Sequence, residues 1–230
     1  MVWSRKELKA KGKRAFQANY WKCVLVALIL TAIIGGGASA GSDSANDAAG
    51  GSDTIIEELR EAPKELIFAI AGALVGVAAI GGVVKLLVFN PLQVGCKRFF
   101  VVNSDEPAQL GELGRGFSNG YGRVVVGMLL RDLFIVLWCL LFVIPGIIKA
   151  YSYRMVPYIL AEDPDISGSE AIRLSRKMMA GHKWNTFVLD LSFFGWYLLA
   201  ALTAGIVNVL WTGPYTEATY AELYKAIRDE

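Results

Sequence analysis

The stretch VVVGMLLRDLFIVLWCLLFVI at residues 124–144 decides the class of fold, since one charged pair, Arg131 and Asp132, interrupts its apolar side chains. A helix that crosses the hydrocarbon core of a bilayer needs about 20 mostly apolar residues, and this stretch has that length. Leu66–Phe89 and Phe187–Ala204 meet the same requirement, with one charged residue each. The sequence therefore predicts an all-α protein of the membrane.

The composition agrees with this class. Hydrophobic residues make up 54% of the chain and charged residues 19%, and the mean hydropathy is +0.43. A soluble domain carries about 25% charged residues. An ordinary soluble domain is therefore not expected.

The residues that commonly hold metals or cofactors are few and scattered. The chain has one histidine, His182, and the cysteines Cys23, Cys96 and Cys139 show no C-x-x-C spacing. Metal sites built on histidine and cysteine need clusters of such side chains. We therefore expect no metal site, no cofactor and no catalytic residues, and hence no enzyme.

Three further apolar segments are weaker candidates for spans. Cys23–Gly35 is short, with Tyr20 and Trp21 beside it as interfacial anchors, and Gly146–Ala161 and Gly205–Ile227 contain several polar residues. If all three cross, the basic stretches of the chain share one side, as the positive-inside tendency requires. The charge pattern thus favours about six transmembrane helices in the plasma membrane, with both termini in the cytoplasm.

The segment at 35–53, rich in Gly, Ser, Ala and Asp, is then a flexible loop outside the cell. An alternative reading makes the N-terminus a secretory signal, because a basic segment and an apolar run precede Ala38-Ser39-Ala40. Short turns are expected at Pro145-Gly146 and Ala204-Gly205, where apolar runs meet with no polar linker.

The same order of basic and apolar segments recurs three times along the chain. A basic stretch leads into two apolar segments, and the second carries a proline, in turn Pro91, Pro157 and Pro214. The basic stretches are Ser4–Lys22, Ala108–Arg123 and Ser167–Lys183. Duplicated membrane folds often leave such a trace. The whole chain, 1–230, is therefore predicted to be one membrane domain, with a threefold repeat over 4–103, 104–162 and 163–230.

Each basic stretch is expected to form an amphipathic helix at the membrane surface. In the third, Ser167 or Ser169 can cap the helix start, Gly181 can end it, and apolar and basic residues fall on different faces. Anionic headgroups attract basic residues near the surface by roughly 1 kcal/mol each. The candidate headgroup contacts are Lys9, Lys13, Arg14, Arg173, Arg176 and Lys177. The alternative is that these residues only set the topology.

Residues 144–224 carry a family resemblance in IPGIIKAYSY at 144–153, PYILAEDPDISGSEAI at 157–172, SRKMMAGHKW at 175–184, FVLDLSFFGW at 187–196 and PYTEATYAELY at 214–224. Together they resemble a bacterial family of integral membrane proteins known as a domain of unknown function. That family is distantly similar to the membrane domain attached to some glycerophosphodiester phosphodiesterases. The resemblance implies a multi-helix membrane protein and no catalytic residues.

Charged residues within membrane helices are costly and are therefore candidates for function. They are Lys85, Arg131, Asp132, Lys149, Arg154, Asp190 and Glu217. We expect the two aspartates to pair with Arg131, Lys149 or Arg154. The network either holds the helices together or lines a pathway for a substrate or protons, and an intramembrane catalytic site is the third alternative.

The favoured function is a non-enzymatic scaffold or accessory protein that contacts lipid or a partner at the cytoplasmic face. The alternative is a transporter or channel-like protein with a polar path between its helices. The expected partners are the bilayer, with anionic lipids, and another membrane protein, but no nucleic acid.

Overall fold

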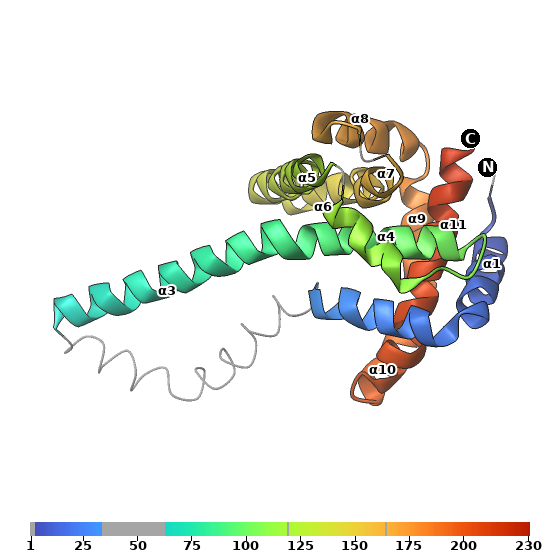
Figure 1. Cartoon of the computed structure of the whole chain (residues 1–230), viewed down its shortest axis with the longest axis horizontal. Helices are drawn as coiled ribbons and strands as arrows, with labels where there is room; N and C mark the ends of the chain where they lie inside the picture. Colours follow the sequence, from blue (N-terminus) through green and yellow to red (C-terminus); the bar gives the residue numbers. More distant parts are fainter. Residues whose placement is uncertain (1–2, 34–62, 119, 164) are drawn as a thin grey trace.

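The computed structural model describes residues 3–33, 63–118, 120–163 and 165–230, and these residues contain helices and no β-strand. Most helices gather into one body, and α3 (Lys64–Val84) extends away from it (Figure 1). The predicted all-α class is confirmed. The predicted loop at 35–53 and the alternative cleavage site at 38–40 lie outside the described residues.

The first basic stretch forms α1 (Arg5–Ala18). The hydroxyl oxygen of Ser4 accepts the backbone N–H of Glu7 at 3.2 Å, which is the Ser-x-x-Glu arrangement of a helix N-cap. The chain bends after α1 and continues as a helix over Tyr20–Ile33, inclined at 107° to α1. The predicted surface helix and the apolar segment after it are therefore separate helices.

The prolines Pro91 and Pro214 each lie in the first turn of a helix that follows a π-helical turn. Proline has no N–H, and its ring clashes with the carbonyl four residues earlier, so the helix before it must loosen. The elements are η1 (Lys85–Phe89) before α4 (Asn90–Asn103), and η3 (Asn208–Thr212) before α11 (Gly213–Arg228). α3, η1 and α4 thus form one long helix with a π turn within it.

Before Pro157 the helix is fully interrupted, because α6 (Val143–Ser152) ends and a separate helix, α7 (Val156–Glu162), begins. The middle hairpin consists of α5 (Tyr121–Leu141), α6 and, after a break, α7. The turn between α5 and α6 is at Phe142, whose backbone is extended, so the turn predicted at Pro145-Gly146 is wrong. Those two residues lie in the first turn of α6, where proline is tolerated. Gly146 permits close contact, because a Cβ there would lie 2.4 Å from the sulfur of Cys139.

The third part contains α8 (Gly168–Met178), α9 (Lys183–Leu191) and α10 (Phe194–Leu202). Ser167 caps α8 by accepting the N–H of Glu170 at 3.2 Å, the same arrangement as at the start of α1. The predicted turn at Ala204-Gly205 is confirmed, with φ of +50° and +83°. Glycine adopts the left-handed region at no steric cost, which explains its place at the second position.

The middle basic stretch departs from the expected α-helix. It forms a 3₁₀ helix, η2 (Leu110–Phe117). Its sequence LGELGRGF contains glycine at 111, 114 and 116, and each glycine within an α-helix costs about 1 kcal/mol relative to alanine. Glycine content therefore explains why this stretch differs from α1 and α8.

The surface helices α1, η2 and α8 each pack through a glycine on a helix from another part of the chain. A Cβ on Gly12 of α1 would lie 2.8 Å from the Cα of Thr219 in α11. A Cβ on Gly116 of η2 would lie 1.9 Å from the carbonyl oxygen of Pro91, at the start of α4. A Cβ on Gly168 of α8 would lie 2.6 Å from the Cα of Gly127 in α5. Larger residues at these glycines would separate the helices.

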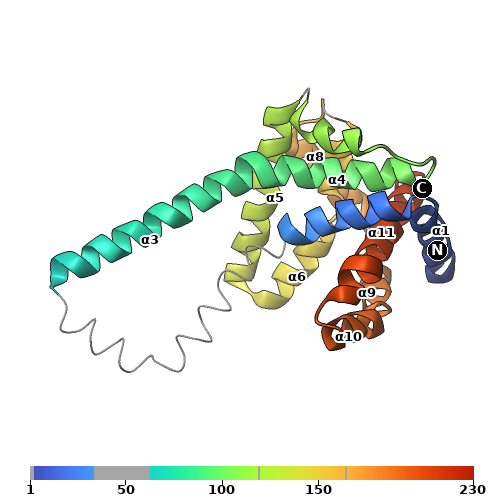
Figure 2. The same cartoon turned by 60° about the horizontal axis from the view of Figure 1, so that its bottom comes forward.

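The helices α4, α7 and α11, which we call the proline-led helices, meet at the centre of the body. Arg98 of α4 donates a hydrogen bond to the carbonyl oxygen of Ala161 in α7 at 2.8 Å. The rings of Tyr158 in α7 and Tyr224 in α11 stack with their centres 5.2 Å apart. Figure 2 shows α5, α6, α9 and α10 extending to one side of this centre.

Among the residues that the structure describes, three helical stretches are long and apolar enough to cross a membrane: Gly72–Asn103, Tyr121–Leu141 and Lys183–Leu202. A fourth is counted if α1 and the helix Tyr20–Ile33 form one broken span. The structure thus contains three to four candidate spans where the sequence predicted about six, and the arrangement of six spans in hairpins is not established.

The two remaining predicted spans, Gly146–Ala161 and Gly205–Ile227, are absent from this set for a physical reason. α6 has 10 residues and is about 15 Å long, half of the roughly 30 Å of a bilayer core. α11 carries polar residues and is mostly buried against the rest of the body. Neither segment therefore satisfies the length and hydropathy of an independent span.

Candidate functional site between the proline-led helices

Asp190 in α9 is the centre of a partly buried set of polar side chains. Its carboxylate accepts hydrogen bonds from the guanidinium of Arg154 at 2.6 Å and from the hydroxyls of Tyr151 and Tyr220 at 2.8 Å each. The Arg154 guanidinium also lies 4.1 Å from the centre of the Tyr220 ring. These donors occupy most acceptor positions of the carboxylate, so it is held as an ion-pair partner and is poorly placed to abstract a proton.

The break before Pro157 explains how Arg154 reaches this position. Tyr151 lies near the end of α6, and Arg154 lies in the irregular residues between α6 and α7. The break is itself stabilised by α8, because the hydroxyl of Ser175 donates to the carbonyl of Ser152 at 2.8 Å and accepts the N–H of Met155 at 3.2 Å.

A second ion pair joins two of the proline-led helices. Lys97 of α4 donates to the carboxylate of Glu217 in α11, and their side chains are only 9% and 16% exposed. Glu217 and Tyr220 are three residues apart on α11 and so face the same side, which places the Lys97–Glu217 pair beside the Asp190 pair. The ammonium of Lys97 lies 5.3 Å from the centre of the Tyr158 ring.

Some buried polar atoms near the prolines have no hydrogen-bond partner among the described residues. They include the hydroxyl of Tyr158, which directly follows Pro157, the side-chain nitrogen of Asn90, which precedes Pro91, and the hydroxyl of Thr212 before Pro214. An unpaired buried polar group costs about 1–3 kcal/mol. The helix interruptions therefore carry an energetic penalty.

A cavity of about 240 Å³ reaches the second ion pair from the side of the apolar helices. Glu217, Tyr220 and Asn208 contribute its polar lining, and Ala27 and Leu30 of the helix Tyr20–Ile33 contribute apolar side chains. Sites for drug-sized ligands usually enclose about 300–1,000 Å³. This cavity is suited to a small group or to water.

The other predicted intramembrane charges lie elsewhere. Asp132 in α5 pairs with its neighbour Arg131 at 2.6 Å and with Lys85 of η1 at 3.7 Å, which links η1 to α5. Lys149 pairs with neither aspartate, and its ammonium lies 4.6 Å from the centre of the Trp138 ring. The seven candidates thus form separate groups, of which the structure brings only Arg154, Asp190 and Glu217 together at the centre.

Most candidate headgroup contacts lie on the surface. Exposed side chains are those of Lys13, Arg14, Arg173, Arg176 and Lys177. Lys9 differs, because its ammonium donates to the carbonyl of Ser192 at 3.0 Å and lies 4.1 Å from the centre of the Phe193 ring. Lys9 therefore attaches α1 to the end of α9 and is a poor candidate for binding lipid.

Sequence reasoning missed Lys97 and the tyrosines of this site. Lys97 lies beyond Leu66–Phe89, the apolar run that predicts a span, so the sequence does not mark it as an intramembrane charge. The prolines provide the signal that could have found it, since Lys97 follows Pro91 by six residues and Tyr220 follows Pro214 by six.

Within the part of the chain that the structure describes, no group of His, Cys, Asp or Glu side chains is arranged to hold a metal ion. The thiols of Cys23 and Cys96 are buried and that of Cys139 is exposed.

A family model described as Protein of unknown function (DUF975) matches residues 118–230. The match includes Arg154, Asp190 and Glu217 but not Lys97, so part of the site lies outside it. No curated protein and no solved structure matches this chain. The resemblance to membrane domains of glycerophosphodiester phosphodiesterases stays a prediction.

Proposed function

We propose that this protein is an integral membrane protein that acts as a non-enzymatic scaffold or accessory protein and contacts lipid or a partner at the cytoplasmic face. One observation carries the proposal: the central charges form ion pairs between different parts of the fold, Arg154 of the α6–α7 break with Asp190 of α9 and Lys97 of α4 with Glu217 of α11. Charges that neutralise one another in this way hold helices together, and they leave no carboxylate or ammonium of the two pairs unpaired for chemistry.

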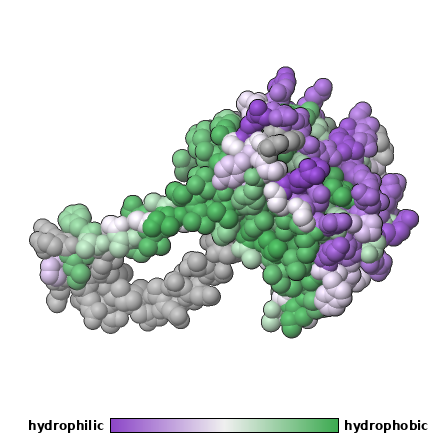
Figure 3. Space-filling view, viewed as in Figure 1, coloured by the Kyte–Doolittle hydropathy of each residue, from purple (hydrophilic) through white to green (hydrophobic). Residues whose placement is uncertain are grey.

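The surface of the molecule supports its placement in a membrane. Hydrophobic residues cover the side from which α3 extends, and hydrophilic residues gather on the opposite side (Figure 3). Leu140 near the end of α5 and Leu202 at the end of α10 are 84% and 80% exposed. Large apolar patches of this kind mark contact with lipid or with another protein. Fractionation tests the placement, since an integral protein stays with membranes after washing at high pH.

The proposed topology has six crossings and both termini in the cytoplasm. α6 and α7 return along α5, which supports a crossing made of two short helices. In a variant with Cys23, Cys96 and Cys139 replaced, we expect single cysteines at Ser44 and Ser169 to be labelled from opposite sides. Labelling of both from the same side would overturn the six-span arrangement.

A transporter is the second candidate, and the cavity that reaches Glu217 is the observation in its favour. Proteoliposomes that contain a pH-sensitive dye separate the two functions. The scaffold proposal expects proton flux equal to that of empty vesicles under an imposed gradient. Flux above that level that is lost in Glu217→Gln would contradict the scaffold and support the transporter.

A further inference from the structure

A larger cavity, of about 430 Å³, lies apart from the site described above, between α4, η2 and α7. Arg98 of α4 and Arg115 and Ser118 at the end of η2 line it with polar groups. Val94 of α4 and Leu160 of α7 contribute an apolar lining. The cavity therefore combines guanidinium groups with an apolar wall.

The two guanidinium groups of this cavity share one carboxylate. The carboxylate of Glu112 accepts a hydrogen bond from Arg98 at 2.8 Å and lies 3.8 Å from the nearest nitrogen of Arg115. One carboxylate thus serves two guanidinium groups, and among these three side chains one positive charge is in excess. Glu162 also lines the cavity, and its carboxylate binds the hydroxyl of Tyr224 and Arg228, which is itself shared with Asp229.

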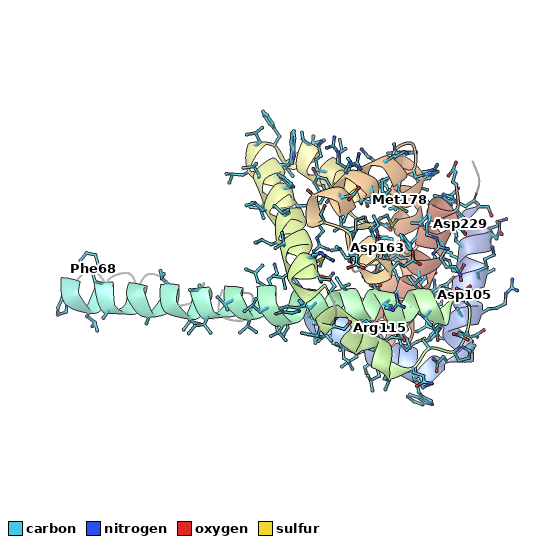
Figure 4. All side chains as sticks on the ribbon, turned by 45° about the horizontal axis from the view of Figure 1, so that its top comes forward. Phe68, Asp105, Arg115, Asp163, Met178 and Asp229 are labelled. Carbon is cyan, nitrogen blue, oxygen red and sulfur yellow. The ribbon has the colours of Figure 1, made fainter. Side chains whose placement is uncertain are left out.

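The two arginine side chains differ in how firmly they are held. Arg98 is fixed, because a second nitrogen of its guanidinium donates to the carbonyl of Ala161, and its side chain is 24% exposed. The Arg115 side chain is 60% exposed, and Figure 4 shows it beside α4. A fixed guanidinium beside a movable one can close on an anion from two sides, and the planar guanidinium matches phosphate oxygens in pairs.

The surroundings favour an amphiphile over a soluble anion. η2 exposes the apolar side chains of Leu110 and Phe117, at 41% and 43%, and Phe117 lies in the chain between the lining residues Gly116 and Ser118. Such side chains are suited to the boundary between headgroups and acyl chains. Basic pockets between membrane helices on the cytoplasmic side are typical binding places of anionic headgroups.

We propose that the cavity between α4, η2 and α7 binds the phosphate of an anionic lipid headgroup through Arg98 and Arg115. This inference rests on the proposed membrane function and names the ligand class for the cytoplasmic face. Arg98 and Arg115 are not among the six basic residues that the sequence predicts as headgroup contacts.

The test is a titration of the purified full-length protein in detergent with phosphatidylglycerol or phosphatidylcholine, with bound lipid counted by native mass spectrometry. We expect tighter binding of phosphatidylglycerol, weakened about fivefold in Arg115→Gln, since one basic residue contributes roughly 1 kcal/mol. Glu112→Gln should tighten binding by a similar factor, because it releases the guanidinium groups from their internal carboxylate. Tighter lipid binding in this variant cannot result from misfolding.

The matched control is Lys11→Gln, which removes an exposed charge of α1 that is paired with Glu7 at 3.0 Å. Equal weakening by Lys11→Gln and Arg115→Gln would overturn the proposal, because binding would then follow overall charge. A loss of binding in Glu112→Gln with an unchanged melting temperature would also overturn it. A titration with inorganic phosphate tests whether the bound phosphate must belong to a lipid. Equally tight binding of inorganic phosphate, with the same response to the variants, would refute the lipid assignment.

Because the titration is carried out in detergent, it is independent of the fractionation and topology experiments. A protein that fractionates as soluble refutes the membrane function. A membrane protein without preference for phosphatidylglycerol refutes this site alone.

Discussion

Replacing Asp190 by leucine removes the carboxylate that accepts hydrogen bonds from Arg154, Tyr151 and Tyr220, while keeping a side chain of similar branched shape. Breaking a buried ion pair from one side costs about 3–5 kcal/mol, because the remaining charge is left unpaired. Both side chains of this pair are about a quarter exposed, so we expect the lower end of that range, a loss of about 3 kcal/mol in the free energy of unfolding.

The double variant Arg154→Met with Asp190→Leu gives a sharper expectation. It removes both charges, and the remaining loss is the missing acceptor for the two tyrosine hydroxyls, roughly 1 kcal/mol each. The double variant should therefore lose about 2 kcal/mol, less than either single variant, and a double-mutant cycle measures the coupling.

The assay is a denaturant titration in mixed micelles, followed by circular dichroism. The control is Asp165→Asn, whose 87% exposed side chain pairs with Arg123, and a loss below about 1 kcal/mol is expected there. If the two single variants at 154 and 190 add up in the double variant, the carboxylate does not act as the structural partner described above, and the reasoning fails.

Other predictions concern glycines and caps. Gly168→Leu should destabilise the fold by at least about 1–3 kcal/mol in the same titration, because it forces α8 away from α5, whereas Gly76→Leu on open α3 should change little; equal effects would contradict the close approach. Ser167→Ala should cost about 1 kcal/mol through loss of the cap of α8, and Ser169→Ala much less. Gly205→Ala should lower the melting temperature, because its φ of +83° strains any side chain, and an unchanged value would argue against that turn geometry.

The sequence predicted well what hydrophobic runs and turn residues determine. The predicted apolar segments Leu66–Phe89, Val124–Ile144 and Phe187–Ala204 each overlap one of the three candidate spans, although the first span continues to Asn103. The turn at Ala204-Gly205 is where a glycine with positive φ was needed. These features depend on neighbouring residues alone. The threefold repeat stays a prediction, and a structural comparison of the three segments is its direct test.

The site was only partly predictable, because its partners are far apart in the chain. Lys97 and Glu217 are separated by 120 residues, and only the meeting of α4 with α11 brings them together. Nothing local to Asp190 distinguishes Arg154 from Lys149 as its partner. The choice depends on the interruption at Pro157, which places Arg154 outside regular helix.

The docking of α1 on α11 has a consequence for synthesis. The face of α1 that carries Leu8 and Phe16 is at most 3% exposed once the last helix is in place. Translation at about 5–20 residues per second delivers α11 roughly 10–40 s after α1. During that interval α11 is not yet there to cover the apolar face of α1. The contact between α1 and α11 therefore forms only after the helices between them have been synthesised.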